Sequence, residues 1–164
     1  MRLFIAIHFS EEIKSTLLQG IRDLRGQASR GNFTRPENLH MTLAFIGETE
    51  NVAAVRKAMN QWKVKPFPLT IGGSGRFGDL WWAGTEKNPA LFDLAEGLKE
   101  SLREEGFAIE KRPFKPHITL ARQVEAHQPI RLNIPKTTMT VDHMSLMRSD
   151  RIGGKLVYTE IYRV

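Results

Sequence analysis

Short apolar runs alternate along the chain with segments whose apolar residues recur at helical spacing. The apolar runs predict strands at residues 2–9, 39–46, 67–72, 80–85 and 117–121, with a further short strand at 107–110. Near the end, residues 138–147 and 156–163 resemble the two arms of a hairpin with Gly153-Gly154 in its connection. Residues 26–37 and 123–137 are polar or contain proline, and we predict loops there.

Three segments carry the 3.6-residue period of amphipathic helices. They are predicted at residues 11–25, from about residue 51 to 62, and at 89–105. Ser10 and Asn88 are suited to cap the first and third of these, and Pro89 fits the first position of a helix. A few helices among many strands joined by short connections predict an α+β architecture rather than a doubly wound parallel sheet.

One short motif occurs twice, as His40-Met41-Thr42-Leu43 and as His117-Ile118-Thr119-Leu120. Both copies lie in apolar, strand-like runs. Because side chains on a strand alternate between its faces, each copy places an imidazole and a hydroxyl side by side on one face. We expect this face to carry chemistry, since two matched buried histidines bring four polar nitrogens that all need partners.

The spacing of the two motifs indicates an internal duplication. Residues 40 and 117 are separated by 77 positions, and the same shift overlays strand-like and helix-like segments that precede them. We therefore predict one domain, residues 1–164, made of two intertwined lobes, with strand-helix-strand units near 2–47 and 79–122. A pseudo-twofold axis would then bring the two histidine pairs face to face across one groove.

Composition narrows the class of protein and its partners. The 164 residues include no cysteine, which excludes disulfides and thiolate metal sites and fits a reducing cytoplasm. The apolar run at residues 3–7 is far too short for a signal sequence or a membrane span. The net charge of +6 favours an anionic partner. Basic residues flank both motifs and the C-terminal hairpin: Arg30, Arg35, Lys111, Arg112, Lys115, Arg122, Arg148, Arg151 and Lys155. This distribution suits a phosphate-bearing ligand.

Several other chemistries are disfavoured by the sequence. Residues 73–78 match G-x-G-x-x-G, but a strand-like segment follows where a dinucleotide fingerprint needs a helix, so we interpret the glycines as a hairpin turn. No G-x-S-x-G nucleophile elbow is present. The motifs pair histidine with threonine, a weak ligand, and place no carboxylate at ligand spacing, so no metal is expected. His8 is interpreted as a core histidine, and His127 and His143 as surface residues.

Two imidazoles and two hydroxyls suffice for phosphoryl transfer without a metal. With an ordinary pKa of about 6.5, one histidine can be neutral and the other protonated near neutral pH, giving a base and an acid. The hydroxyls of Thr42 and Thr119 would donate to the phosphoryl oxygens. Arg122, two positions beyond Leu120, is expected on the imidazole face and would add positive charge. Acyl transfer is less favoured because no nucleophile accompanies the histidines.

The residues resemble those of a known family. Asn-Leu-His-Met-Thr-Leu-Ala-Phe-Ile-Gly at 38–47 and Pro-His-Ile-Thr-Leu-Ala-Arg at 116–122 resemble the paired motifs of the 2H phosphoesterase superfamily. The likeness is strongest to its bacterial and archaeal RNA 2′,3′-cyclic phosphodiesterases, long called 2′-5′ RNA ligases. It extends over essentially the whole chain, from the opening Arg-Leu-Phe-Ile-Ala-Ile to Ser149, a glycine turn and Tyr158.

The resemblance implies a bilobal, pseudo-twofold-symmetric α+β fold. Two mainly antiparallel sheets would have helices outside and a central cleft lined by both motifs. It further implies hydrolysis of RNA 2′,3′-cyclic phosphate ends, or of small cyclic nucleotides, to 2′-phosphomonoesters with no metal or cofactor. By similarity His40 is the proton donor, His117 the proton acceptor, and Thr42 and Thr119 contact the phosphate. Phe45 and Arg122 are candidates for substrate binding. We expect a cytoplasmic monomer with no protein partner.

The sequence leaves other activities open. One is 2′-5′ ligation, the reverse sense of the same transesterification, and another is hydrolysis of other cyclic or 2′-5′-linked nucleotides. A non-catalytic alternative is a basic RNA-binding module in which the histidines only donate hydrogen bonds. Such a module would be expected to scatter aromatic residues over an open platform, whereas Trp81 and Trp82 are adjacent.

Overall fold

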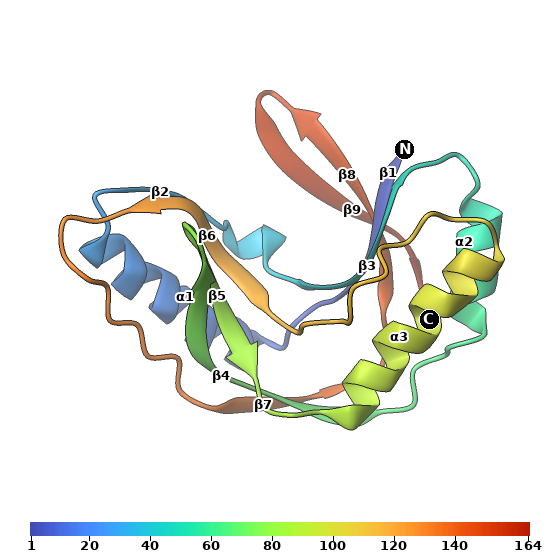
Figure 1. Ribbon diagram of the computed structural model, residues 1–164, viewed down its shortest axis with the longest axis horizontal. Helices are drawn as coiled ribbons and strands as arrows, with labels where there is room; N and C mark the ends of the chain where they lie inside the picture. The colour runs from blue at the N-terminus through green and yellow to red at the C-terminus, as the bar shows by residue number, and fades with distance from the viewer.

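The computed structural model describes all 164 residues, and its strands form two antiparallel sheets (Figure 1). The elements in chain order are β1 (Arg2–Ile7), α1 (Glu11–Gln27), β2 (Arg30–Phe33), the short 3₁₀ helix η1 (Pro36–Asn38), β3 (Met41–Glu48), α2 (Val52–Asn60), β4 (Phe67–Phe77), β5 (Leu80–Thr85), α3 (Pro89–Glu104), β6 (Ile118–Glu125), β7 (Thr137–Val141), β8 (Ser145–Ile152) and β9 (Lys155–Arg163). The four-stranded sheet has the order β3-β1-β8-β9, and the five-stranded sheet has the order β2-β6-β5-β4-β7.

The helices begin where their capping residues predict. The Ser10 hydroxyl accepts a hydrogen bond from the backbone N–H of Ile13, and two acidic residues occupy the first turn of α1, where the helix dipole favours negative charge. At α3, the Asn88 side chain accepts from the N–H of Leu91, and Pro89 occupies the first helical position. Both predicted helix starts are confirmed.

The helices lie outside the two sheets. α1 packs against β2, β6 and β7 of the five-stranded sheet, whereas α3 packs against α2 and against β3 and β4 (Figure 1). The helix α1 therefore comes from the first half of the chain but covers the sheet that carries the second motif. Most of the buried apolar residues of both sheets and all three helices join in one core cluster of 34 residues. The predicted α+β architecture of antiparallel sheets with external helices is confirmed.

The element boundaries repeat at the spacing of the two motifs. β3 runs from residue 41 to 48, and β6 begins and ends 77 positions later, at 118 and 125. The helix α1 begins at residue 11 and α3 at residue 89, close to the same offset. This repetition supports our proposal of a single domain built from two intertwined, duplicated lobes.

One predicted strand end was wrong because the glycines at residues 72–75 do not break the strand. β4 was predicted to end at Gly72 but continues to Phe77, so the turn itself is formed by Gly78 and Asp79. Within this extension, a Cβ at Gly75 would come within 2.3 Å of the Trp82 ring on the paired strand β5. Glycine is needed there so that the indole can lie across the strand.

Three further predictions on local structure were also wrong. Residues 107–110 form no strand, because the Arg103 side chain donates to the carbonyls of Ile109 and Glu110 and takes the place of a neighbouring strand. The predicted loop 26–37 contains β2 and η1. The predicted hairpin arm 138–147 is divided between β7 in one sheet and β8 in the other, so the hairpin is formed by β8 and β9.

None of the helices combines the length and the apolar composition that crossing a membrane requires.

Truncating a core side chain of α3 tests this packing. Leu98 is fully buried, so Leu98→Ala should lower the free energy of unfolding by about 2–5 kcal/mol through lost burial and a residual cavity. Phe92→Ala, on an exposed position of the same helix, should cost about 1 kcal/mol or less. Urea denaturation of both variants measures the difference, and equal losses would contradict the assignment of the buried face.

Candidate active site

The ring of His40 is held by two hydrogen bonds within its own motif. Its Nδ1 lies 2.7 Å from the backbone oxygen of Asn38. A carbonyl can only accept, so the Nδ1 atom carries a proton and donates it. Nε2 lies 2.9 Å from the Thr42 hydroxyl, which donates to it when the imidazole is neutral. The first motif therefore fixes both the orientation and the tautomer of its histidine.

His117 is held in the same way in the second motif. Its Nδ1 lies 2.8 Å from the backbone oxygen of Lys115, again two residues earlier in the chain. The proton is therefore also on Nδ1, and Nε2 is left to exchange a proton with another group. The strand that carries Thr119 is held by a side chain as well. The hydroxyl of Thr34, which directly follows β2, donates to the backbone oxygen of Thr119 at 3.0 Å.

Aromatic rings form the walls beside both imidazoles. Phe4 and Tyr158 lie 5.0 and 5.2 Å from the His40 ring, and the Tyr158 contact is edge-on. Phe77 lies 5.4 Å from the His117 ring in a T-shaped arrangement. Such contacts are favourable beyond the area that they bury and limit rotation of the imidazoles.

The fold brings the two motifs together from different sheets. β3 and β6, which begin directly after the two histidines, contact one another near the middle of the molecule (Figure 1). The positive charge of His117 is also close enough to His40 to affect its titration. The hydroxyl-bearing residues Thr42 and Thr119 are both partly exposed. All four motif residues predicted to act on a phosphate thus lie in one region, which we call the paired-histidine site.

Burial distinguishes His40 within this site. Desolvation lowers the pKa of His40 below its ordinary value, because removal from water penalises the charged form. The carbonyl of Asn38 opposes this shift, whereas the positive charges of His8, Arg122 and His117 add to it. His40 is therefore held neutral more readily than a free imidazole, and a bound anion would reverse the preference.

The two predicted substrate contacts have different surroundings. Phe45 is 65% exposed on β3, and its ring lies 6.2 Å from Phe4. Arg122 is exposed on β6, and its charge acts on His40. Regular alternation from Thr119 would turn Arg122 to the same face as Leu120, so strand alternation does not place it on the imidazole face. Gln123 has a φ of 55°, and this left-handed residue interrupts the regular strand geometry beside Arg122.

His8 is not a core residue, in contrast to our interpretation of the sequence. It is half-buried, it directly follows Ile7, which the ladder pairs with Met41, and its charge acts on His40. Alternation along β1 places its even-numbered side chains in a small cluster of Phe4, Ala6 and Met147, apart from the main core. The contribution of Phe4 to the aromatic walls was missed for the same reason, since β1 is apolar on both faces and shows no alternation in sequence.

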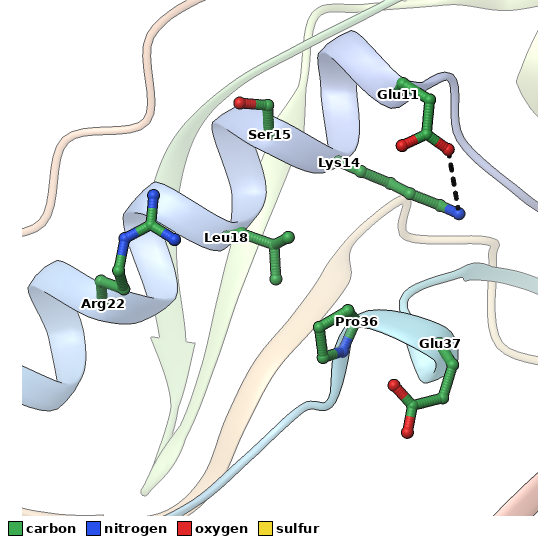
Figure 2. Close-up of a pocket in the computed structure, with 7 residues that line it drawn as sticks. All are labelled: Glu11, Lys14, Ser15, Leu18, Arg22, Pro36 and Glu37. Carbon is green, nitrogen blue, oxygen red and sulfur yellow. Dashed lines mark ion pairs between the residues drawn. The ribbon is translucent and has the colours of Figure 1, made fainter.

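A separate cavity of about 390 Å³ lies between α1 and η1 (Figure 2). Figure 2 shows Lys14 directed toward Glu11, and these side chains form an ion pair at 3.6 Å. Glu37 faces the cavity from the opposite side, and no histidine lines it. Its mixed charge gives it no preference for a phosphate, so we do not place the reaction there. No group of three or more histidine, aspartate or glutamate residues is arranged to hold a metal ion.

Fold and site together define a two-sheet protein in which a repeated His-x-Thr motif presents two imidazoles with the same tautomer. The sequence pattern of the 2′-5′ RNA ligase superfamily matches residues 10–153. The chain belongs to this superfamily.

Individual relatives are similar over most of the chain. A protein of Escherichia coli named RNA 2′,3′-cyclic phosphodiesterase is 30% identical over 169 residues, covering 99% of this chain and 94% of the relative. A protein of the same name from Geobacillus stearothermophilus is 29% identical over 162 residues, but the chain spans only about half of its length, 52%. The crystal structure of E. coli LigT complexed with 3′-AMP has a TM-score of 0.88 at 28% identity, covering 99% of this chain and 96% of that one.

The histidine environments predict a distinctive titration. The His40 imidazole should titrate below the ordinary value of about 6.5, because burial disfavours its charged form. In the neutral state its ¹⁵N shifts should show a proton on Nδ1. Histidine NMR measures both properties, with the resonance assigned by its loss in His40→Asn and the exposed His127 as the internal control. A titration midpoint above 6.5, or a proton on Nε2, would contradict this description.

Proposed function

We propose that this protein hydrolyses RNA 2′,3′-cyclic phosphate ends to 2′-phosphomonoesters by paired-histidine acid–base catalysis without a metal. The single observation that carries the proposal is the matched pair of imidazoles. Each donates its Nδ1 proton to a carbonyl two residues earlier, so Nε2 is the nitrogen that can exchange a proton, and in His40 this atom accepts from the Thr42 hydroxyl. The relatives named RNA 2′,3′-cyclic phosphodiesterase support the choice of substrate.

In the proposed reaction, Nε2 of His117 removes a proton from a water molecule while the water oxygen forms a bond to phosphorus. The bond between phosphorus and the ribose 3′ oxygen breaks, and Nε2–H of His40 protonates that oxygen as it leaves. The reaction leaves His117 protonated by the water and His40 neutral after it has protonated the ribose oxygen. Exchange of these protons with solvent restores both residues for the next turnover.

The neighbouring groups stabilise the charge on phosphorus. The Thr42 hydroxyl, which donates to His40 Nε2, can donate to a phosphoryl oxygen instead, and Thr119 supplies the equivalent hydroxyl from the second motif. Arg122 adds positive charge to the same region. The exposed ring of Phe45 offers a surface for a base to stack on.

The buried setting of His40 suits the role of acid. An imidazolium whose pKa has been lowered by burial gives up its proton more readily to the departing oxygen. The negative charge of a bound phosphate raises the pKa of His40 again, so binding of the substrate would favour the protonated form that the reaction needs.

We further propose that the protein acts as a monomer in the cytoplasm. Both histidine motifs and both aromatic walls belong to a single chain, which supports a site that needs no second copy. Light scattering coupled to size exclusion measures the mass, which should correspond to one chain of 18.7 kDa.

Removing either imidazole should slow turnover while leaving the fold intact. His40→Ala and His117→Ala should each lower kcat by about 10²–10⁴-fold on a 2′,3′-cyclic-phosphate-ended oligonucleotide in the presence of a chelator, the usual scale for losing an acid or base. The matched control is His127→Ala, which removes an exposed histidine and should leave kcat unchanged.

The products and the chelator separate this proposal from its alternatives. Absence of turnover in the wild-type protein would favour a non-catalytic RNA-binding module. Loss of activity with chelator would indicate a metal-dependent enzyme. Formation of 2′-5′ linkages from oligonucleotide ends without net hydrolysis would indicate a ligase.

The pH dependence should reflect the lowered pKa of His40. His40 can act as an acid only while it is protonated. Its contribution to the rate is therefore present at pH values below the pKa of His40 and is lost as the pH rises through that pKa. Burial lowers that pKa, so as the pH rises the decline of kcat/KM should already begin at a pH lower than 6.5. The decline of kcat, measured with the anionic substrate bound, should begin at a higher pH. Steady-state kinetics across pH checks both profiles. Alkaline limbs that coincide would contradict the assignment of His40 as the acid.

A further inference from the structure

The hairpin of β8 and β9 extends beyond the rest of its sheet (Figure 1). β1 pairs with β8 only as far as Arg2 and Ser149, whereas β8 and β9 continue to pair with each other through residues 150–157. We call residues 150–157 the arm. Its far end, Arg151 to Lys155, is exposed, and the side chain of Ile152 is 62% exposed.

The arm is anchored to the segment that precedes the first motif. Arg35 and the Asn38 side chain both donate to the backbone oxygen of Leu156. A two-stranded ribbon is marginally stable alone, so these bonds hold the arm in place. The backbone oxygen of Asn38 also accepts the Nδ1 proton of His40, and this residue therefore joins the arm to the paired-histidine site.

Positive charge continues from the paired-histidine site onto the arm. Tyr158, whose ring packs edge-on against His40, directly follows the arm on β9. Three arginines from different strands, Arg122, Arg2 and Arg151, are close enough for their charges to act on the Tyr158 hydroxyl. Lys155 lies across the ladder from Ile152 at the tip, about 10 Å along the strand from Tyr158.

Nearby carboxylates do not cancel this charge at the tip. Asp150 pairs with Arg148 at 2.8 Å, and Glu37 pairs with Arg35 at 3.5 Å. Arg151 and Lys155 take part in no ion pair, and Arg151 donates a hydrogen bond to the backbone oxygen of Gly154. Two unpaired cations, one on each face of the ribbon, thus stand at the exposed end of the arm.

We propose that the arm binds the single-stranded RNA segment leading to the reacting phosphate, an inference that rests on the proposed function. A 2′,3′-cyclic phosphate terminates a strand at its 3′ end, so all further nucleotides lie on its 5′ side and leave the site in one direction. Arg122, Arg2 and Arg151 gather around Tyr158 between the paired-histidine site and the tip, and they give that polyanion a positively charged path. The preferred substrate is therefore an oligonucleotide rather than a mononucleotide.

Reversing the charge at the tip tests the arm separately from the chemistry. In Arg151→Glu/Lys155→Glu, kcat/KM on a cyclic-phosphate-ended single-stranded oligonucleotide should fall at least tenfold more than kcat/KM on a 2′,3′-cyclic mononucleotide, mainly through KM. The matched control, Lys63→Glu/Lys65→Glu, reverses two exposed lysines that lie between α2 and β4 and form no ion pair, and should affect both substrates equally.

Salt dependence and direct binding complete the experiment. Loss of two phosphate contacts should reduce the slope of log affinity against log salt concentration by roughly 1.4 for a single strand. Fluorescence anisotropy with an oligonucleotide ending in a 3′-phosphate measures this slope without turnover. Equal effects of the tip and control variants, or an unchanged slope, would overturn the proposal. Absence of turnover in the wild-type protein would refute the proposed function, while anisotropy would still decide whether the arm binds RNA.

Discussion

The paired-histidine site depends on one repeated hydrogen bond, in which an imidazole Nδ1–H donates to the backbone carbonyl two residues earlier. The bond forms at Asn38 for His40 and at Lys115 for His117. In each case it determines which nitrogen carries the proton and directs the other away from the backbone. A carbonyl cannot change its role with pH, so Nδ1 keeps its proton in both the neutral and the charged ring. In the chemistry we propose, the role of the backbone is to supply these two carbonyl acceptors.

The two rings are anchored in the same way but lie in different surroundings. His40 packs against Phe4 and Tyr158 with its Nε2 occupied by Thr42, whereas Phe77 is the aromatic ring beside His117. A duplicated motif would by itself give two equivalent imidazoles. Desolvation penalises the charged form, so burial lowers the pKa of His40 and makes it differ from a free imidazole. The aromatic walls therefore contribute to the electrostatics of the site as well as to its shape.

The sequence predicted the parts of this structure that depend on short-range patterns. Helix starts followed from Ser10 and Asn88, whose side chains cap the next turn, and the two motifs followed from strand alternation. Features set by distant pairings were missed. The division of residues 137–152 between two sheets depends on which strands lie beside them, and the length of β4 depends on an indole that Gly75 accommodates. The walls formed by Phe4 and Tyr158 require the register of β1, β8 and β9, which no local pattern specifies.

The position of β1 has a consequence for how the protein forms. This strand is made first, yet it lies between β3 and β8, and β8 follows it by more than a hundred residues. Until β8 has been synthesised, one edge of β1 has no partner and the apolar side chain of Phe4 is uncovered, which makes the growing chain prone to association with other chains. Contacts between residues so distant in sequence also slow folding. The ring that flanks His40 on β9 arrives later still, so a ribosome-bound chain holds both histidines well before it can assemble a working site.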